Sequence, residues 1–212
     1  MDRVIAYIDG FNLYFGLKDS GLKNCYWLNI QSLAQKFLKP QQQLDYVKYF
    51  TAKIKQPSDK SQRQHLYLQA IETLSDTSIY YGRYMQNEKT CRLCGGKYFV
   101  NSEKMTDVNM AVEMMTDAMQ DKFDTAFLIS GDGDLTGPVR AIQNLFPSKK
   151  VFVMFPPKRF SHDLSKVASA FATIGERRIA KSLFPKQIIL PNGYKIDSPP
   201  RWFSTIIPTP AP

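Results

Sequence analysis

Carboxylate side chains occur at three places in the sequence where a regular element is expected to begin or end. They are Asp9 with the nearby amide of Asn12, Asp107, and Asp132 with Asp134. Ionised carboxylates within a few ångströms repel one another, so that either one takes up a proton or a cation joins them. Because the ligands would be hard oxygens with no histidine beside them in the sequence, Mg²⁺ or Mn²⁺ is the expected cation. Such an ion can polarise a phosphodiester and activate water, which predicts metal-dependent hydrolysis of phosphodiester bonds.

Short apolar runs alternate with helical patterns along the first 171 residues. Strands are expected over 3–8, 45–54, 78–84, 125–130 and 150–155, and helices over 29–38, 58–74, 106–119, 135–146 and 163–171. The segment 87–100 is expected to be irregular. This alternation predicts an α/β fold of three layers, with a mostly parallel central sheet between helices. Sites in such folds lie at the carboxyl ends of the strands, where Asp9 and the Gly-Asp-Gly-Asp segment of residues 131–134 are expected.

Charge is distributed unevenly along the chain. The 28 basic and 19 acidic side chains give a formal charge of +9, yet residues 103–134 hold eight acids and two lysines. That acidic stretch is either a solvated helix face or a cation-binding centre inside a basic rim. Basic residues near aromatic ones suit a single-stranded nucleic acid. The expected contacts to such a strand are Lys104, Lys149, Lys150, Lys158 and Arg159.

Composition restricts the class of protein. The 212 residues, 43% of them hydrophobic, are enough for one domain with a small appendage. No apolar run is long enough to cross a bilayer, and the first residues do not resemble a secretory signal, so no membrane partner is expected. Three cysteines are too few for a disulfide scaffold, which favours a cytoplasmic location.

Three motifs, taken in order, resemble those of the NYN domain family, in its LabA-like branch, within the PIN-like nuclease superfamily. They are YIDGFNL at 7–13, EKMTDVNMA at 103–111 and SGDGDL at 130–135, and the resemblance spans roughly residues 3–175. It implies a Rossmann-like, PIN-like α/β/α fold and metal-dependent RNA cleavage. The resemblance places the metal on Asp9, Asp107, Asp132 and Asp134. Asn12 and Ser130 match polar residues of the family and are expected to help orient the reacting groups.

The main hypothesis is therefore a ribonuclease that cleaves RNA with metal-activated water. The alternative is a non-catalytic, regulatory NYN module that binds RNA or protein. A third reading is a haloacid-dehalogenase-like phosphatase, because the segment 132–136 matches the nucleophile motif Asp-x-Asp-x-Thr of that family. The motif comes late in this chain and no acidic pair follows it. A homo-oligomer is left open.

The expected domain covers residues 1–175, with a cysteine-containing insertion near 87–102. Residues 176–212 are expected to form an extension with a small hairpin and a proline-rich tail. In the insertion, Cys91-Arg-Leu-Cys94-Gly-Gly resembles half of a zinc knuckle. Intramolecular zinc, a zinc ion shared between subunits, and reduced thiols all remain open at this stage.

Overall fold

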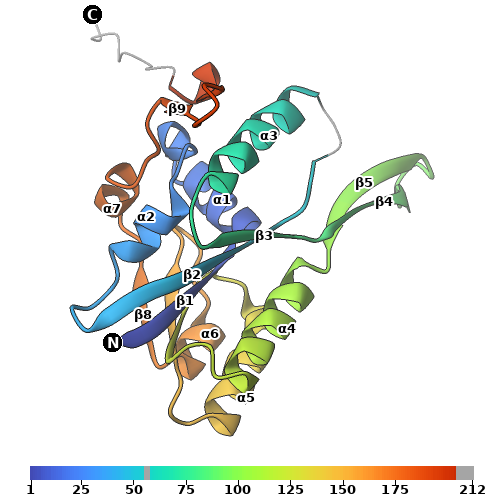
Figure 1. Ribbon diagram of the computed structural model, residues 1–212. Coiled ribbons are helices and arrows are strands. Elements are labelled where there is room, and N and C mark those ends of the chain that lie inside the picture. The colour runs from blue at the N-terminus through green and yellow to red at the C-terminus, as the bar shows by residue number, and fades with distance from the viewer. Residues whose placement is uncertain (55–57, 204–212) are drawn as a thin grey trace, which may run out of the picture.

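A six-stranded parallel sheet forms the centre of the molecule, in the order β3-β2-β1-β6-β7-β8 (Figure 1). The computed structural model describes residues 1–54 and 58–203, with the backbone alone at 58, 84–87 and 100–103. The strands of the sheet are β1 (Asp2–Asp9), β2 (Gln42–Thr51), β3 (Thr77–Tyr81), β6 (Thr125–Ile129), β7 (Lys150–Phe155) and β8 (Ala170–Thr173). Every neighbouring pair is parallel, so all six strands end at the same edge of the sheet.

Helices cover both faces of the sheet and complete three layers (Figure 1). One face carries α1 (Gly10–Asp19), α2 (Ile30–Gln35), α3 (Ser58–Glu72) and α7 (Glu176–Ala180). The other carries α4 (Thr106–Met119), α5 (Thr136–Leu145) and α6 (His162–Val167). Short 3₁₀ turns are η1 (Lys23–Cys25), η2 (Gly133–Leu135) and η3 (Pro200–Trp202). The predicted α/β/α fold with a parallel sheet is confirmed.

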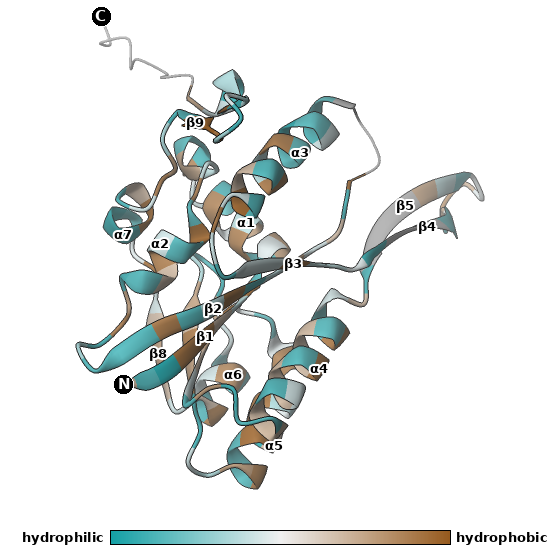
Figure 2. Cartoon of the chain, in the orientation of Figure 1, coloured by the Kyte–Doolittle hydropathy of each residue, from teal (hydrophilic) through white to brown (hydrophobic). Residues whose placement is uncertain are grey.

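The burial of the central strand β1 explains why its sequence is apolar from Val4 to Ile8. Val4 and Ile8 are buried against the helices of the first face, whereas Ile5 and Tyr7 are buried against those of the second. Side chains of a strand alternate between the two faces, so a strand covered on both sides has no polar face. Figure 2 shows brown segments along β1 and β2 beyond their teal beginnings, and both colours on the helices that cover them.

Two expectations about the elements were wrong. The segment expected to be irregular forms an antiparallel ribbon of β4 (Arg83–Thr90) and β5 (Lys97–Lys104), which extends away from the domain (Figure 1). The helix expected over 163–171 ends at Val167, and the following residues form the edge strand β8. The described side chains of β4, β5 and β8 are mostly exposed, so these strands gave little of the alternation between buried apolar and exposed polar residues that marks a strand in a sequence.

The C-terminal extension contains the expected hairpin, formed by β9 (Gln187–Ile189) and β10 (Lys195–Asp197). It packs onto the domain through a separate apolar cluster that contains Trp27, Ala70, Phe184, Ile196 and Trp202. Of the proline-rich tail, residues 204–212 lie outside the described residues, and the domain boundary near 175 stays a prediction. In the described ranges, no helix combines the length and the apolar character needed to cross a bilayer.

Candidate metal centre

Three carboxylates from distant parts of the chain meet at the edge where the parallel strands end. Asp9 ends β1, Asp107 lies in the first turn of α4, and Asp132 follows β6 as the N-cap of η2. One ligand oxygen from each lies within 4.8 Å of the other two. These three side chains are therefore close enough to share a cation.

Asp9 is buried and tightly held. Its side chain, 4% exposed, caps α1 by accepting a hydrogen bond from the amide of Asn12 at 2.9 Å. Its second oxygen accepts the hydroxyl of Ser130 at 3.0 Å. A Cβ atom on Gly10 would lie 2.5 Å from the Tyr49 ring, so glycine lets α1 begin directly against the sheet. This geometry leaves Asp9 one orientation, toward the other acids.

Asn12 and Ser130 connect the segment after β1 to the segment after β6. The side-chain oxygen of Asn12 accepts the amide of Gly131 at 2.9 Å, and Ser130 Oγ accepts the amide of Asp132 at 3.0 Å. A Cβ on Gly131 would collide with the backbone carbonyl of Arg159, so only glycine fits there. These bonds set the position of Asp132 relative to Asp9.

Asp107 reaches the centre through an unusual backbone turn. Met105, the residue before α4, has a φ of 77°, a left-handed conformation that is costly for a side chain other than glycine. This turn ends β5 and directs the first turn of α4 toward Asp9 and Asp132. Such strain is retained where the surrounding structure requires it, often at functional sites.

The electrostatics fit a cation. Burial raises the pKa of the Asp9 carboxyl to about 6, against its bonds to Asn12 and Ser130, and the charges of Asp107 and Asp132 raise it further. The pKa of Asp107 is also raised, by burial first and then by the charges of Asp132 and Asp134. Among the described residues, no lysine or arginine forms an ion pair with these three acids. A bound divalent cation would supply the missing positive charge, and the oxygen ligands suit Mg²⁺ or Mn²⁺.

Asp134 lies beside this group rather than in it. Its side chain is exposed, its amide donates to Asp132 Oδ1 at 3.0 Å, and its charge acts on Asp107. Its role as a metal ligand stays a prediction.

The basic residues expected to hold a nucleic acid divide between the two ends of the sheet. Lys158 follows the carboxyl end of β7 and donates to the carbonyl of Asp19 at 2.9 Å; Arg159 beside it pairs with the carboxylate of Asp19. Lys104 ends β5, directly before the turn into α4, and is exposed. Lys158 and Arg159 therefore lie at the same edge of the sheet as the carboxylates, and Lys104 lies two residues before α4. That these three residues contact a nucleic acid stays a prediction.

Lys149 and Lys150 lie away from the carboxylates; the prediction that Lys149 contacts a nucleic acid needs correction, whereas for the exposed Lys150 it stays a prediction. They lie at the amino end of β7, where the amide of Lys150 donates to the carbonyl of Asp124 at 3.0 Å. The Lys149 side chain, 6% exposed, pairs with Asp121 at 2.6 Å and donates to the carbonyl of Phe123. Lys149 is therefore a buried structural group at the opposite edge of the sheet.

Part of the acidic stretch is structural as well, which sequence reasoning missed. Asp117 is fully buried and lies 2.5 Å from the ammonium of Lys48, which also pairs with Glu113 at 2.6 Å. The hydroxyl of Tyr7 donates to Asp117 at 2.7 Å. Asp117 follows Met110 by seven residues and so lies on the same, buried face of α4. This spacing in the sequence could have shown that Asp117 is buried.

The cysteine pair lies in the turn between β4 and β5. Backbone amides of Cys94 and Leu93 lower the pKa of the Cys91 thiol by hydrogen bonding to it. Cys25 is buried in the core of the domain. Within the described parts of the chain, no third residue of a metal-binding type joins this pair. A closed zinc site within one chain therefore lacks two of its four ligands there.

Comparison with known proteins agrees with these features. The profile of the NYN domain family matches residues 3–175. A crystal structure of a protein of unknown function from Vibrio parahaemolyticus, VPA0982, aligns with a TM-score of 0.54 at 20% identity, over 82% of this chain and 94% of that chain. At that identity the likeness shows the fold alone, and comparison with curated proteins finds no match. Because the matched residues form most of the sequence and include the three carboxylates that meet in space, the chain belongs to the NYN domain family.

Proposed function

We propose that this NYN domain protein, as a member of the LabA-like branch, is a ribonuclease that requires Mg²⁺ or Mn²⁺ and cleaves single-stranded RNA. The observation that supports this most is the meeting of Asp9, Asp107 and Asp132 within 4.8 Å at the strand ends. Membership of the NYN family adds weight, because the family is nuclease-like and belongs to the PIN-like superfamily.

The residues of the centre are proposed to have two roles, metal coordination and positioning of the metal ligands. Asp9, Asp107 and Asp132 supply oxygen ligands, and Asp134 is proposed as a fourth. When bound, a divalent cation polarises a phosphodiester and lowers the pKa of a coordinated water. Asn12 and Ser130 act on the reaction by holding Asp9 and Asp132 in place. Such positioning matters because small displacements of reacting groups slow a reaction strongly.

Cations beside the centre are proposed to hold the RNA backbone. Lys104 precedes the turn into α4, and Lys158 with Arg159 follows β7 at the edge where the strands end, positions that support this proposal. Phosphate contacts of this kind position a strand without reading its sequence.

Incubation of the full chain with end-labelled single-stranded RNA and Mn²⁺ tests the proposal. We expect cleavage products, which EDTA abolishes and which the double variant Asp9→Asn with Asp132→Asn does not form. Asp45→Asn, prepared in the same way, is the matched control for a contaminating nuclease and should cleave as the native protein does. Cleavage that survives the double variant would contradict the proposal.

The same assay separates the other two functions. RNA binding with a steep salt dependence and without products would favour the non-catalytic module. Hydrolysis of a small phosphomonoester, lost in Asp132→Asn while RNA stays intact, would favour the phosphatase.

A further inference from the structure

A cavity of about 580 Å³ opens beside the metal centre, between α1, α3 and the C-terminal extension. We call it the aromatic cavity, because its walls include the rings of Phe11, Tyr14, Phe15, Tyr26, Tyr67 and Trp202. One end is formed by Gly10, the residue after Asp9, and by Thr51 at the end of the neighbouring strand β2. Its volume falls in the range of pockets that bind small molecules. The cavity therefore reaches the edge of the sheet at which Asp9 ends β1.

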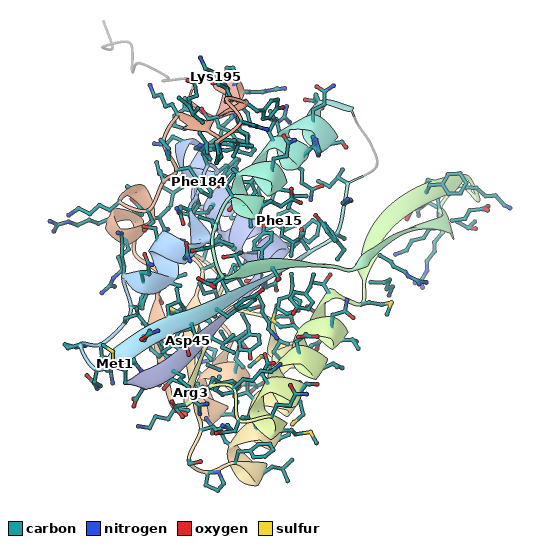
Figure 3. The ribbon with its side chains drawn as sticks, viewed as in Figure 1. Met1, Arg3, Phe15, Asp45, Phe184 and Lys195 are labelled. Atoms are coloured by element: carbon teal, nitrogen blue, oxygen red, sulfur yellow. The ribbon has the colours of Figure 1, made fainter. Side chains whose placement is uncertain are left out.

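The rings form a nearly continuous row along α1 and into the extension. Phe11 and Phe15 stack with centroids 6.4 Å apart, Tyr14 lies 5.0 Å from Tyr26, and Tyr26 lies 5.7 Å from Trp202. Phe15 is labelled in Figure 3, on the side of the sheet that α1 and α3 cover. Tyr14 and Phe15 remain 40% and 38% exposed, so part of this apolar surface is open to a ligand. Rings arranged in this way can stack with the bases of a single strand.

The charged side chains that line the cavity are cationic. Among the described residues, its lining contains no carboxylate and five cationic side chains, namely Lys18, Lys23, Lys60, Arg63 and Arg201. Arg63 and Arg201 are held at the rim by a shared partner, Asp59, at 2.8 and 3.2 Å. The ammonium of Lys18 lies 5.6 Å from the centre of the Phe15 ring. Flat aromatic surfaces bordered by cations are complementary to a ligand that joins a planar ring to an anion, and a nucleotide is such a ligand.

We propose that the aromatic cavity binds a nucleotide that flanks the scissile phosphate, with its base against Tyr14 and Phe15 and its phosphate facing Lys18 and Lys60. The proposal rests on the proposed function, because it places this nucleotide on the strand that the metal centre cleaves. It gives a physical reason for a single-stranded substrate, since a base must leave its duplex to enter a cavity. It also gives the C-terminal extension a role, because Trp202 closes the end of the row of rings.

Binding of RNA to the metal-free protein tests the proposal apart from catalysis. The full chain in EDTA is titrated against a short 5′-labelled single-stranded RNA, and binding is followed by fluorescence anisotropy. Tyr14→Ala should weaken binding about tenfold to hundredfold, the effect of losing one stacked base. Tyr98→Ala, which removes a half-exposed ring on the distant ribbon, is the matched control and should bind as the native protein does.

The salt dependence adds a second readout. Lys60→Gln should reduce the slope of log affinity against log salt by about 0.7, the value of one phosphate contact on a single strand. Lys166→Gln, an exposed lysine of α6 on the opposite face, should leave the slope unchanged. If the native protein cleaves RNA, Tyr14→Ala should raise KM more than it lowers kcat.

The outcomes separate this proposal from the proposed function. Weakened binding by both variants, with no cleavage by the native protein in Mn²⁺, would support the nucleotide cavity and contradict the nuclease. Native-like binding by both variants would overturn the nucleotide cavity, even if the native protein cleaves RNA. Absence of RNA binding by the native protein would also overturn it, and a peptide would then be the occupant to consider.

Discussion

Removing the charge of Asp9 is expected to stabilise the metal-free protein while abolishing the metal centre. Burial raises the pKa of Asp9 from 3.8 to about 6, a shift of roughly two units. One unit corresponds to about 1.4 kcal/mol, so the ionised carboxylate costs the folded state about 3 kcal/mol at pH 7. Asparagine keeps the shape but loses an acceptor for the Ser130 hydroxyl, which costs about 1 kcal/mol. The expected net gain for Asp9→Asn is about 2 kcal/mol.

The sign of the pH dependence follows from the same shift. The folded state binds the Asp9 proton more tightly than the unfolded chain does, so between pH 4 and 6 it holds more protons. The contribution of Asp9 to the stability of the native protein is therefore retained below about pH 4 and lost as the pH rises through about 6. Asp9→Asn has no such loss. The stability difference should grow across this window and be absent or slightly reversed at pH 4.

Urea unfolding in EDTA, followed by tryptophan fluorescence at several pH values, measures this difference. Asp45→Asn is the control, since Asp45 lies in the first half of β2, away from the strand ends (Figure 3). Adding Mn²⁺ should stabilise the native protein and leave Asp9→Asn almost unchanged, because the cation binds the intact carboxylates. A variant that is less stable than the native protein at pH 7, or a difference independent of pH, would refute the reasoning.

Three further predictions concern the scaffold and the ribbon. Gly131→Ala should weaken Mn²⁺ binding and lower stability, because its Cβ atom would collide with the Arg159 carbonyl. Gly133→Ala should do neither, because the atom nearest to its Cβ would be Ser161 Oγ at 3.6 Å. Calorimetric titration with Mn²⁺ compares the two variants. Lys48→Met should lower the free energy of unfolding by about 3–5 kcal/mol, because it removes the cation 2.5 Å from the buried Asp117 carboxylate and leaves the more exposed Lys122, 3.3 Å away; a loss under about 1 kcal/mol in urea would contradict this. The two thiols of the ribbon should bind at most about one zinc ion per two chains, since four ligands close a zinc site; a full equivalent per chain by metal analysis would show otherwise.

The predictions that proved correct follow from local sequence patterns that have the same three-dimensional result in many proteins. Apolar runs that alternate with helices predict a parallel sheet, and parallel strands end at one edge, which brings Asp9 and Asp132 together. Asp107 lies at the start of a helix rather than at a strand end. Its place beside Asp9 and Asp132 was predicted from the resemblance of the three motifs, in their order, to the NYN family.

The errors have a common physical cause in long-range pairing. Nothing around Asp117 in the sequence shows that Lys48 of β2 pairs with it in addition to the nearby Lys122, so the acidic stretch could not be divided into structural and functional parts. Lys149 was assigned to the nucleic-acid surface because its charge is visible in the sequence, whereas its burial at the amino end of β7 depends on Asp121 and the Phe123 carbonyl. The aromatic cavity was missed because its rings come from α1, α3 and the extension.

Anomalous X-ray scattering from a crystal soaked in Mn²⁺ tests the central claim most directly. We predict an anomalous peak at the carboxylates of Asp9, Asp107 and Asp132, and no such peak in the double variant Asp9→Asn with Asp132→Asn. A native crystal with manganese bound elsewhere and none among these three carboxylates would contradict the metal centre and the ribonuclease proposed from it.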